Sequence, residues 1–501
     1  MTGDSTLLEG WMALGDVDRA AVHDRGGATS FRQVVGRADG VAAALLDGRD
    51  SLLGERVALL VSPGADFVCG FFGVLRAGGV VVVLSTLHPP PETQYFCDDA
   101  AVRSIVVSRE LRSHVRLLSG EHRILEIDAL GSAQRRSRPL PRGRGADPAL
   151  QLYTSGTTGK PKGAVITHDN LATQQRLLRD AWGWHPGDAL LHMLPLHHMH
   201  GLAIAWLSAV GAGATTRFVG PFDASRVWDE MAEATVLMAV PTIHAKLFAA
   251  FDAASLSRKH EWERGARGLR LVTSGSAALP VTVGHRWSDL TGAYPLERFG
   301  MTEIGVGTSN PLEPGRRRPG TVGVPLPTVE TRIVDDELWV AGPSVFAGYH
   351  GKPEATAGAF VMDAGTRWFR TGDTVAREDD GYIRILGRTS VDILKSGGYK
   401  LSALEIEEVL REHPAVLEVA VVGLPDATWG DRVVACVVAR PELSGECTED
   451  SLRGFARERL AAYKIPRSVV VMRELPRNPI GKVVKPTLVA DLQRESGGSG
   501  A

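Results

Sequence analysis

The sequence predicts an α/β protein with a large N-terminal domain of parallel-rich sheets and helices, followed by a small mobile α+β domain. In the first 150 of its 501 residues, short β-branched runs alternate with helical stretches. This alternation is typical of parallel strands covered by helices. Past Arg388 the pattern becomes a mixture of strands and helices about a hundred residues long, a length typical of one small domain. We therefore expect domains at residues 1–388 and 389–501.

The N-terminal elements follow from these alternating runs. A stretch rich in Pro, Arg and Gly, from Arg135 to Arg144, indicates a solvated linker rather than a binding surface. The elements expected before this linker are strands at Val57–Val61, Val80–Leu84 and Ser104–Ser108, and helices at Ala65–Arg76 and Pro91–Ala100.

The same patterns continue after the linker. Thr331–Val340 predicts a hairpin that turns at Asp335-Asp336, and the Gly/Ser-rich tail Ser496–Ala501 predicts disorder. The other expected elements are helices at Asn170–Trp182, Leu404–Glu412 and Asp450–Ala461, and strands at Val236–Val240, Leu269–Thr273, Val416–Val422, Asp431–Val438 and Ser468–Met472.

The composition argues against several classes of function. A formal net charge of −2 gives no electrostatic reason to bind nucleic acid or an anionic membrane. The apolar stretch from Val57 to Leu84 contains Asp66, Arg76 and several glycines, which indicates buried strand and helix instead of a membrane span. Four scattered cysteines without a CxxC pair indicate a reducing compartment and no structural zinc. Since the N-terminus also lacks the pattern of a secretion signal, we expect a cytoplasmic protein.

A dense run of glycines, hydroxyl side chains and lysines extends from Tyr153 to Ala164, with the sequence YTSGTTGKPKGA. Small residues let the backbone curl so that its N–H groups converge on an anion. The hydroxyls and lysines add donors and positive charge for phosphate oxygens. Pro161 follows Gly159-Lys160 where a Walker A loop requires Ser or Thr. A polar surface loop is the alternative interpretation.

This run resembles the phosphate loop of the adenylate-forming enzymes, which include acyl-CoA synthetases, adenylation domains of peptide synthetases and luciferases. The resemblance covers essentially the whole chain, because the signatures of that family follow in order from Tyr153 to Lys485. It implies ATP, Mg²⁺ and CoA as cofactors and co-substrates, and a small carboxylic acid as the partner. The ATP-binding residues that it implies in this loop are Thr154, Ser155, Gly156, Thr157, Thr158, Gly159 and Lys162.

Two later stretches resemble the signatures around the acyl group. Leu194–Gly201 has three histidines in four residues, which suggests a metal site, but no Cys or carboxylate partners are near in sequence. The resemblance places His200 near the substrate carboxylate, and a structural histidine is the alternative. Thr273–Pro280 follows an expected strand, with a plain tight turn as its alternative. The resemblance implies Ser274 beside the acyl group, and Ser276, Ala277 and Ala278 beside ATP.

Glu297–Glu303 resembles the family's aromatic-Gly-x-Thr-Glu motif. The resemblance implies that Phe299 stacks on adenine, although the family more usually has tyrosine there, so any bond of the tyrosine hydroxyl is absent. It also implies that Thr302 contacts phosphate. Glu303 supplies a hard oxygen ligand, which suits a magnesium ion bridging the ATP phosphates. The ATP-binding residues implied in this motif are Phe299, Gly300 and Met301.

The sequence around Arg298 resembles the malonyl-CoA synthetases in particular. A second carboxylate on the substrate requires a fork of donors, and arginine supplies two parallel hydrogen bonds. A structural salt bridge with a neighbouring carboxylate is the alternative. Malonate-specific relatives usually carry Met at the position of Val306. The shorter valine leaves space, which suggests an acyl pocket that also admits malonates with a C2 substituent.

Two further signatures concern the ribose and the junction between the domains. The resemblance implies that Asp373 and Arg388 bind the ribose hydroxyls, with a surface turn at Asp373 as the alternative. It places a hinge within residues 389–392, and we favour Asp392. Glycines in the following loop would let the thin chain of CoA pass close to the backbone. The CoA-binding residues implied there are Lys395, Ser396, Gly397, Gly398 and Tyr399.

The last signature, Arg477–Lys485, contains Lys482 at the position of the family's catalytic lysine, with a solvated surface lysine as the alternative. The whole pattern predicts a ligase, a monomer or a homodimer. It converts malonate, or a C2-substituted malonate, through an acyl-adenylate to the acyl-CoA, and releases AMP and pyrophosphate. One alternative is an adenylation enzyme that loads another small acid onto CoA or a carrier protein. Another is an inactive nucleotide-binding regulator, which would be expected to lack key site residues. The catalytic residues implied are His200, Thr302, Glu303 and Lys482.

Overall fold

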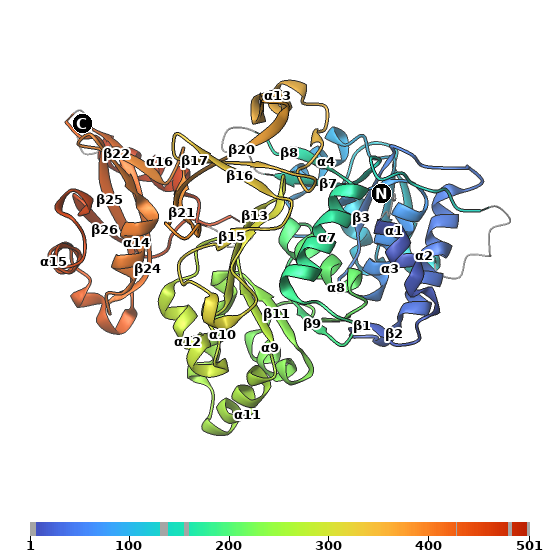
Figure 1. Cartoon of the computed structure of the whole chain (residues 1–501), viewed down its shortest axis with the longest axis horizontal. Helices are drawn as coiled ribbons and strands as arrows, with labels where there is room; N and C mark the ends of the chain where they lie inside the picture. The colour runs from blue at the N-terminus through green and yellow to red at the C-terminus, as the bar shows by residue number, and fades with distance from the viewer. Residues whose placement is uncertain (1–6, 131–138, 155–159, 427, 479–482, 498–501) are drawn as a thin grey trace. The chain divides into compact units, whose positions relative to one another are not determined.

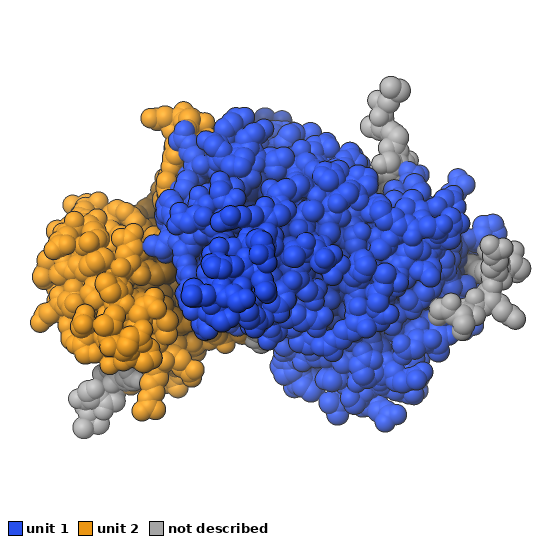
Figure 2. All heavy atoms as spheres, turned by 90° about the horizontal axis from the view of Figure 1, so that it is seen from below, with its two compact units in different colours: residues 1–331, 340–369 blue, residues 332–339, 370–501 orange. Residues whose placement is uncertain are grey.

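The chain forms two compact units. Unit 1 comprises Met1–Thr331 and Val340–Phe369, and unit 2 comprises Arg332–Trp339 and Arg370–Ala501 (Figure 2). These units are defined by compactness. The boundary expected at 388/389 is the start of a domain that moves as a body, and it stays a prediction. The computed structural model describes residues 7–130, 139–154, 160–426, 428–478 and 483–497.

A seven-stranded sheet lies in the N-terminal part of unit 1, in the order β18-β8-β7-β4-β3-β5-β6 (Figure 1). The five strands from β7 to β6 pair in parallel, and β8 and β18 continue the sheet antiparallel at one edge. Strand β4 is four consecutive buried valines, Val80–Val83, as expected of a parallel strand covered on both faces. The other strands are β3 (Arg56–Leu60), β5 (Ser104–Val107), β6 (Arg123–Glu126), β7 (Pro148–Thr154), β8 (Lys162–Thr167) and β18 (Gly348–Tyr349).

A nine-stranded sheet completes unit 1, in the order β15-β14-β13-β12-β11-β9-β10-β1-β2. Its strands run parallel from β13 to β1, so their carboxyl ends share one edge, where ligands bind in sheets of this kind. The strands are β1 (Ala20–Asp24), β2 (Gly27–Ser30), β9 (Ala189–His192), β10 (Thr215–Phe218), β11 (Val236–Ala239), β12 (Leu271–Ser274), β13 (Leu296–Met301), β14 (Gly305–Ser309) and β15 (Val324–Pro325).

Helices of unit 1 cover both sheets. Four of them, α9 to α12, gather beside β11 (Figure 1), and buried tryptophans fill the core between them. The ring of Trp228 stacks on those of Trp262 and Trp287, with centroids 5.7 and 5.6 Å apart. The longer helices are α2 (Phe31–Leu46), α3 (Ala65–Arg76), α4 (Pro90–Asp99), α7 (His168–Trp182), α9 (Ala224–Glu230), α10 (Pro241–Ala253), α11 (Leu256–Arg267) and α12 (Val281–Thr291).

Helix α7 begins two residues earlier than the helix expected at Asn170–Trp182. The Thr167 side chain accepts a hydrogen bond from the Asn170 N–H, and the Asn170 side chain accepts one from the Thr167 N–H. This capping box fixes the start of the helix. Asn170 also donates to the backbone carbonyls of Pro343 and Val345, so the same residue connects α7 with the segment before β18.

Unit 2 contains the predicted small α+β arrangement. The hairpin of β16 (Glu330–Val334) and β17 (Glu337–Ala341) turns at Asp335 and Asp336, whose φ values are +50° and +69°. A second sheet has the order β23-β22-β25-β24, with β26 parallel to β25. The remaining elements are β20 (Thr366–Arg377), which begins in unit 1, β21 (Ile383–Arg388), β22 (Ile393–Ser396), β23 (Tyr399–Ser402), β24 (Val416–Asp426), β25 (Gly430–Ala439), β26 (Ser468–Met472), α14 (Ala403–Arg411), α15 (Glu449–Arg457) and α16 (Lys485–Gly497).

Among the described residues, no helix is long and apolar enough to cross a membrane. All four cysteines are buried and free, at positions Cys69, Cys97, Cys436 and Cys447. The shorter elements of unit 1 are α1 (Leu7–Met12), α5 (Arg112–Val115), α6 (Ile127–Leu130), α8 (Leu207–Gly211), α13 (Pro353–Ala359) and β19 (Phe360–Asp363).

Candidate functional site

A buried arginine without an anionic partner marks one part of the site in unit 1. Arg298, on β13, is only 3% exposed, and its Nε and Nη2 atoms make no hydrogen bond within the described structure. It forms no ion pair with any described carboxylate, so the alternative of a structural salt bridge is not supported there. Burial lowers the pKa of Arg298 to about 9, so the guanidinium remains charged at neutral pH.

Glycine lets the backbone lie close to this guanidinium. A Cβ atom on Gly275 would lie 2.5 Å from Cζ of Arg298, too close for any other residue without a shift. Gly275 follows the end of β12, whose residues Thr273 and Ser274 have buried hydroxyls without a hydrogen-bond partner in the described structure. Thr308, on β14, has a third such hydroxyl. Strands β12 and β14 therefore offer three unused hydroxyls, as a ligand site requires.

His200 lies close enough to Arg298 for the positive charge of the guanidinium to affect its pKa. Burial, and next the positive charge of Arg298, hold the pKa of His200 well below its usual value, so the imidazole is neutral. Its Nδ1 atom is 3.2 Å from Oγ of Ser276, and its Nε2 atom has no partner in the described structure. Ser276 has a φ of +70°, a left-handed conformation that is uncommon for non-glycine residues.

His200 also begins a π-helix, which extends to Trp206 and is buried throughout. Wide helical turns of this type are rare and occur frequently at functional sites. His192, the last residue of β9, donates from Nε2 to the Gly201 carbonyl at 2.9 Å and so fixes the first turn. The structure therefore brings together Arg298, His200 and Ser276, all predicted from the sequence.

Val306 is fully buried, and a residue that the sequence analysis missed holds it in place. Oε1 of Gln174, on α7, accepts a hydrogen bond from the Val306 N–H at 2.8 Å. A Cβ on the neighbouring Gly305 would lie 1.7 Å from the same oxygen. The signal that could have identified Gln174 is its polar side chain at helical spacing from the apolar residues Leu171, Leu177 and Leu178.

The end of β13 connects to the phosphate loop through a second missed residue, Tyr349. Its hydroxyl donates to Oε1 of the buried Glu303 at 2.9 Å. The Nζ atom of Lys162 lies 5.0 Å from the centre of the Tyr349 ring, within the range of a cation–π contact. Lys162 therefore contacts the ring of Tyr349, and Glu303 contacts its hydroxyl. Phe299, Gly300, Met301 and Thr302 are half-buried between Arg298 and Glu303, and Ser276, Ala277 and Ala278 are exposed after β12.

Strands β7 and β8 present the ends of the phosphate loop. Thr154, the last residue of β7, pairs with Lys162, the first residue of β8. The Nζ atom of Lys160 lies 5.3 Å from the centre of the Tyr95 ring. The predicted ATP-binding residues between them, Ser155, Gly156, Thr157, Thr158 and Gly159, lie outside the described residues.

In unit 2, the two residues predicted to bind ribose face each other. Asp373 on β20 is in register with Arg388 on β21, and Nε of Arg388 lies 3.3 Å from Oδ1 of Asp373. Arg388 also donates from Nη1 to the Thr371 carbonyl. A buried carboxylate held by a half-buried arginine forms a rigid pair at a strand edge, which a bare surface turn would not provide.

The predicted CoA-binding residues form the turn of the β22–β23 hairpin. Gly397 and Gly398 have φ values of +58° and +85°, which glycine adopts without strain. A Cβ on Gly397 would meet the Trp429 ring at 3.2 Å. Tyr399 is exposed and stacks on Tyr463, with ring centroids 4.4 Å apart. Lys395 is exposed and Ser396 is buried on the first strand of the hairpin.

Lys482, the predicted catalytic lysine, lies outside the described residues. The described residues on either side are joined, because Arg477 forms an antiparallel bridge with Val483. Asp392, the favoured hinge residue, lies in the short connection between β21 and β22, and its Oδ2 atom accepts from the Arg388 N–H at 3.0 Å.

Three other histidines lie side by side. The rings of His88, His197 and His198 contact one another, with centroids 4.8 and 4.1 Å apart. Burial and the neighbouring imidazoles lower the pKa of His197 to about 2. Within the described part of the chain, no group of three or more His, Cys, Asp or Glu side chains is arranged to hold a metal ion.

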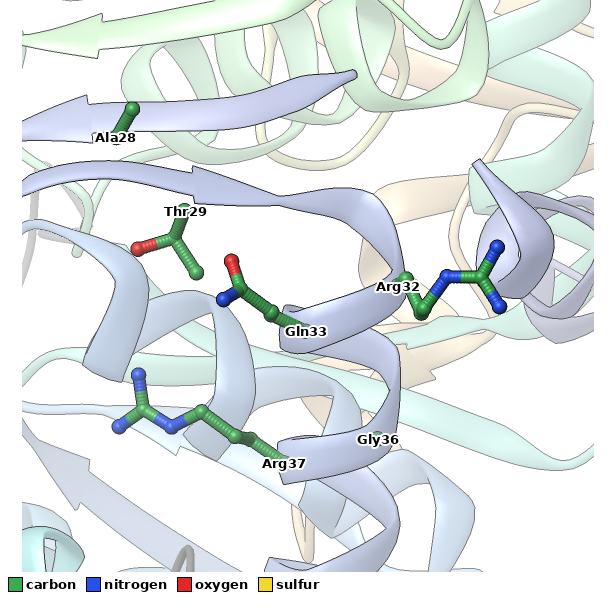
Figure 3. A pocket seen from close by; sticks show the side chains of 6 residues that line it. All are labelled: Ala28, Thr29, Arg32, Gln33, Gly36 and Arg37. Carbon is green, nitrogen blue, oxygen red and sulfur yellow. The ribbon is translucent and has the colours of Figure 1, made fainter. Parts of the chain in front are cut away.

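A surface hollow of about 430 Å³ lies at β2 and α2, and its lining contains none of the predicted site residues (Figure 3). Its two arginines already have partners, because Arg32 pairs with Asp18 and Arg37 pairs with Asp66. The hollow is lined by Ala28, Thr29, Arg32, Gln33, Gly36 and Arg37 (Figure 3).

Comparison with known proteins gives the same picture for nearly the whole chain. A family model described as AMP-binding enzyme matches residues 11–350, and a model described as AMP-binding enzyme C-terminal domain matches residues 405–482. The chain is 38% identical to the mitochondrial malonate–CoA ligase of Bos taurus, and the match covers 95% of this chain and 88% of that protein.

Several solved structures resemble this chain in fold. ATP-bound MatB from Rhodopseudomonas palustris matches with a TM-score of 0.87 at 34% identity, over 98% of this chain and 99% of that chain. A malonyl-CoA ligase in a ternary product complex with methylmalonyl-CoA and AMP matches with a TM-score of 0.66 at 36% identity, over 92% of this chain and 97% of that chain. The likeness confirms the fold class predicted from the sequence.

Proposed function

Because this chain belongs to the AMP-binding enzyme family, we propose that it is an AMP-forming ligase that joins CoA to malonate or to a C2-substituted malonate. The family predicted from the sequence signatures is confirmed. The choice of acid is supported by the names of the relatives, one of which is a malonate–CoA ligase and another of which holds methylmalonyl-CoA and AMP.

The observation that carries the malonate assignment is the buried guanidinium of Arg298. A charged group in a dry site is costly unless an opposite charge and hydrogen bonds compensate it. Since no described carboxylate does so, the site suits a ligand that brings its own negative charge. Malonate has two carboxylates, so one can react while the other accepts a forked pair of hydrogen bonds from Arg298. A monocarboxylic acid would leave the guanidinium unpaired.

The first half-reaction makes the acid reactive. A carboxylate is a poor electrophile, so one of its oxygens attacks the α-phosphorus of ATP, an acyl-adenylate forms, and pyrophosphate leaves. Negative charge develops on the phosphate oxygens, and positive groups placed around them lower the barrier. We assign this role to Lys162, to the phosphate loop, and to Lys482.

Glu303 is the residue that would hold a magnesium ion. Its carboxylate is a hard oxygen ligand, and the Tyr349 hydroxyl orients it at the end of β13, beside the start of β8. A magnesium ion bound there would add positive charge for the phosphate oxygens of ATP.

The second half-reaction transfers the acyl group. The thiolate sulfur of CoA attacks the acyl carbonyl carbon, the bond from that carbon to the AMP oxygen breaks, and AMP leaves. We assign Asp373 and Arg388 to the ribose, and the hairpin that contains Gly397 and Gly398 to CoA. Rotation about Asp392 would present Lys482 in the first half-reaction and the hairpin in the second.

A panel of acids tests the proposal. Purified protein is given ATP, magnesium and CoA with malonate, methylmalonate, succinate, acetate or propionate, and AMP release is measured. We expect malonate and methylmalonate to be the best substrates. Equal rates with propionate would refute the assignment of Arg298. If no short diacid supports exchange of labelled pyrophosphate into ATP, the ligase proposal itself is wrong.

A further inference from the structure

The hairpin of β13 and β14 contains a β-bulge close to the residues predicted to bind the acid. Phe299 on β13 stands opposite Thr308 on β14, but the next residue, Gly300, stands opposite Val306. Gly307 is therefore an extra residue on β14, between these two pairs. Bulges of this kind are frequent next to active sites, where they re-aim a side chain.

The bulge decides which face of the hairpin carries Val306. Residues directly opposite each other in an antiparallel pair share a face, and so do alternate residues of one strand. Val306 is opposite Gly300, which follows Arg298 by two residues, so the valine shares the face of the arginine. With regular pairing, Gly307 would take that place, and Val306 would stand opposite Met301 on the other face. The bulge therefore brings the valine to the side of the guanidinium.

Other contacts place this face of the hairpin in the acyl site. Strand β14 lies against the π-helix that begins at His200. Burial, and next the charge of Arg298, lower the pKa of His200, so these two side chains are close together. Val306 is fully buried, so its side chain takes up volume on the face that it shares with Arg298. Moving the valine off this face would enlarge the space beside the guanidinium.

The side chain of Gln174, on α7, holds the bulge. Its Oε1 atom accepts a hydrogen bond from the Val306 N–H at 2.8 Å, and the residue is only 3% exposed. Its Nε2 atom has no hydrogen-bond partner in the described structure. A buried amide nitrogen without a partner is destabilising, whereas an apolar side chain would pack there without that cost. Stability alone therefore does not explain a glutamine at this position.

We propose that Gln174 is a specificity-determining positioning residue, which holds the bulge and so keeps Val306 on the Arg298 side of the acyl pocket. The inference rests on the proposed function and deepens it, because it concerns which malonates the site accepts. Without the hydrogen bond, the hairpin can relax toward regular pairing, in which Gly307 replaces Val306 on that face. A glycine leaves more room than a valine, so a larger C2 substituent would then fit.

The test compares kcat/KM for butylmalonate with kcat/KM for malonate, each measured by AMP release. Gln174→Met keeps the length of the side chain but removes the acceptor. We expect it to raise the ratio of butylmalonate over malonate by about tenfold, a typical effect of making room for a methylene or two. Gln174→Glu keeps an acceptor oxygen and should retain the parent ratio. Both acids carry two carboxylates, so a charge on this glutamate would affect both and cancel in the ratio.

A double variant separates this role from a general loss of stability. If Gln174 acts through Val306, the gain from Gln174→Met should largely disappear in a Val306→Ala background, because the valine is already absent there. Independent effects would instead multiply. A gain in that background as large as the gain in the parent would overturn the inference.

The matched control is Gln175→Met, on the next residue of the same helix. Nε2 of Gln175 donates to the Leu207 carbonyl at 2.9 Å, so this variant also loses one amide hydrogen bond, but not the bond to the bulge. It should leave the ratio unchanged, and a gain equal to that of Gln174→Met would contradict the proposal. If Gln174→Met does not fold, Gln174→Asn, whose side chain is too short to reach the Val306 N–H, must show the gain.

Two outcomes distinguish this inference from the proposed function. An unchanged ratio in folded Gln174→Met, with a parent that releases AMP from malonate, overturns the inference alone. A parent that releases no AMP with any short diacid refutes the proposed function, and this inference with it.

Discussion

At the scale of single residues, Arg298 combines deep burial with a charge that persists at neutral pH. Its pKa of about 9 lies well above neutral pH, so the guanidinium is protonated before any ligand binds. Burial has already removed water from its Nε and Nη2 atoms. A carboxylate that reaches them therefore forms charge-assisted hydrogen bonds in a low dielectric, where such bonds are strong.

We expect Arg298→Ala to lower kcat/KM for malonate far more than for propionate. The loss of two charge-assisted hydrogen bonds is worth about 3–4 kcal/mol, or on the order of 10²–10³-fold in kcat/KM. Propionate has no second carboxylate, so its kcat/KM should change by less than about threefold. Arg298→Lys keeps the charge without the fork and should lie between the two. A uniform loss with both acids would remove Arg298 from the substrate site.

Val306 gives a second prediction at this scale, for the size of the acid. Its backbone is fixed by Gln174, so a longer side chain must extend into the space beside it. We expect Val306→Met to lower the ratio of kcat/KM for butylmalonate over malonate by about tenfold, a typical value for removing room for a methylene or two. Val306→Ala should move the ratio in the opposite direction. An unchanged ratio would show that Val306 does not limit the pocket.

The sequence could not identify residues that matter only because they contact another site residue in the folded chain. Arg298, His200 and Glu303 belong to recognisable motifs, and their types already indicate their chemistry. Gln174 and Tyr349 belong to no motif, and each becomes informative only when folding places it against Val306 or Glu303. The burial of Arg298 also could not be predicted, because it depends on contacts with segments as far apart in sequence as those of His200 and Gly275.

At the scale of elements, the π-helix His200–Trp206 is the least regular structure in the site. Its first turn is held by His192, which can donate to the Gly201 carbonyl only through a protonated Nε2. Burial lowers the pKa of His192 to about 4, so its Nδ1 stays unprotonated and the ring neutral. A wide helical turn at this point is thus coupled to the protonation of a buried side chain.

This coupling predicts an acid sensitivity with a definite sign. Because the pKa of His192 is lower in the folded state than in the unfolded state, the unfolded state takes up the proton first. The contribution to the free energy of unfolding is complete above about pH 6.5 and is lost as the pH falls toward 4. Between pH 7.5 and pH 5 we expect His192 alone to account for about 2 kcal/mol, measured by urea unfolding at both values.

His192→Gln provides the control for this measurement. The amide can donate to the same carbonyl but does not titrate, so the variant should lose about 2 kcal/mol less than the parent between the two pH values. If the variant and the parent lose the same amount, the titration of His192 does not set the acid sensitivity of the fold. Other buried histidines, such as His244, contribute equally to both proteins and cancel in the comparison.

Elements with a clear pattern of apolar or β-branched residues could be predicted from the sequence. Elements fixed by tertiary contacts could not. Helix α3 has the predicted bounds Ala65–Arg76, and β26 has the predicted bounds Ser468–Met472. In both cases the residues of the element itself predict it, through an apolar stripe or a β-branched run. The π-helix has no comparable pattern, and its first turn accepts a hydrogen bond from His192, nine residues from Gly201 in sequence.

At the scale of the whole molecule, the sequence signatures divide into two sets that fall in different compact units. The residues predicted to contact phosphate, the acyl group and adenine, from Thr154 to Val306, fall in unit 1. The residues predicted to contact ribose and CoA fall in unit 2. Unit 2 comprises residues 332–339 and 370–501, and the domain boundary predicted at 388/389 stays a prediction. The division into units reflects how the residues pack. The sequence near Arg388 shows only where the pattern of strands and helices changes.

Because the predicted site residues fall in two units, the effect of Lys482→Ala tests whether one unit moves between the two half-reactions. If one small domain serves two reactions by turning, the lysine acts only in the orientation that forms the adenylate. We expect pyrophosphate exchange to fall on the order of 10²–10³-fold or more, the usual effect of removing one group that stabilises developing charge. Thioester formation from synthetic malonyl-adenylate should remain near the parent rate, because Lys482 has no charge to stabilise there. Both rates are measured on one preparation, so a loss of folded protein lowers them together and is recognised. Equal losses in a fully folded variant would mean that both reactions use the same orientation, and the domain rotation about Asp392 would have to be abandoned.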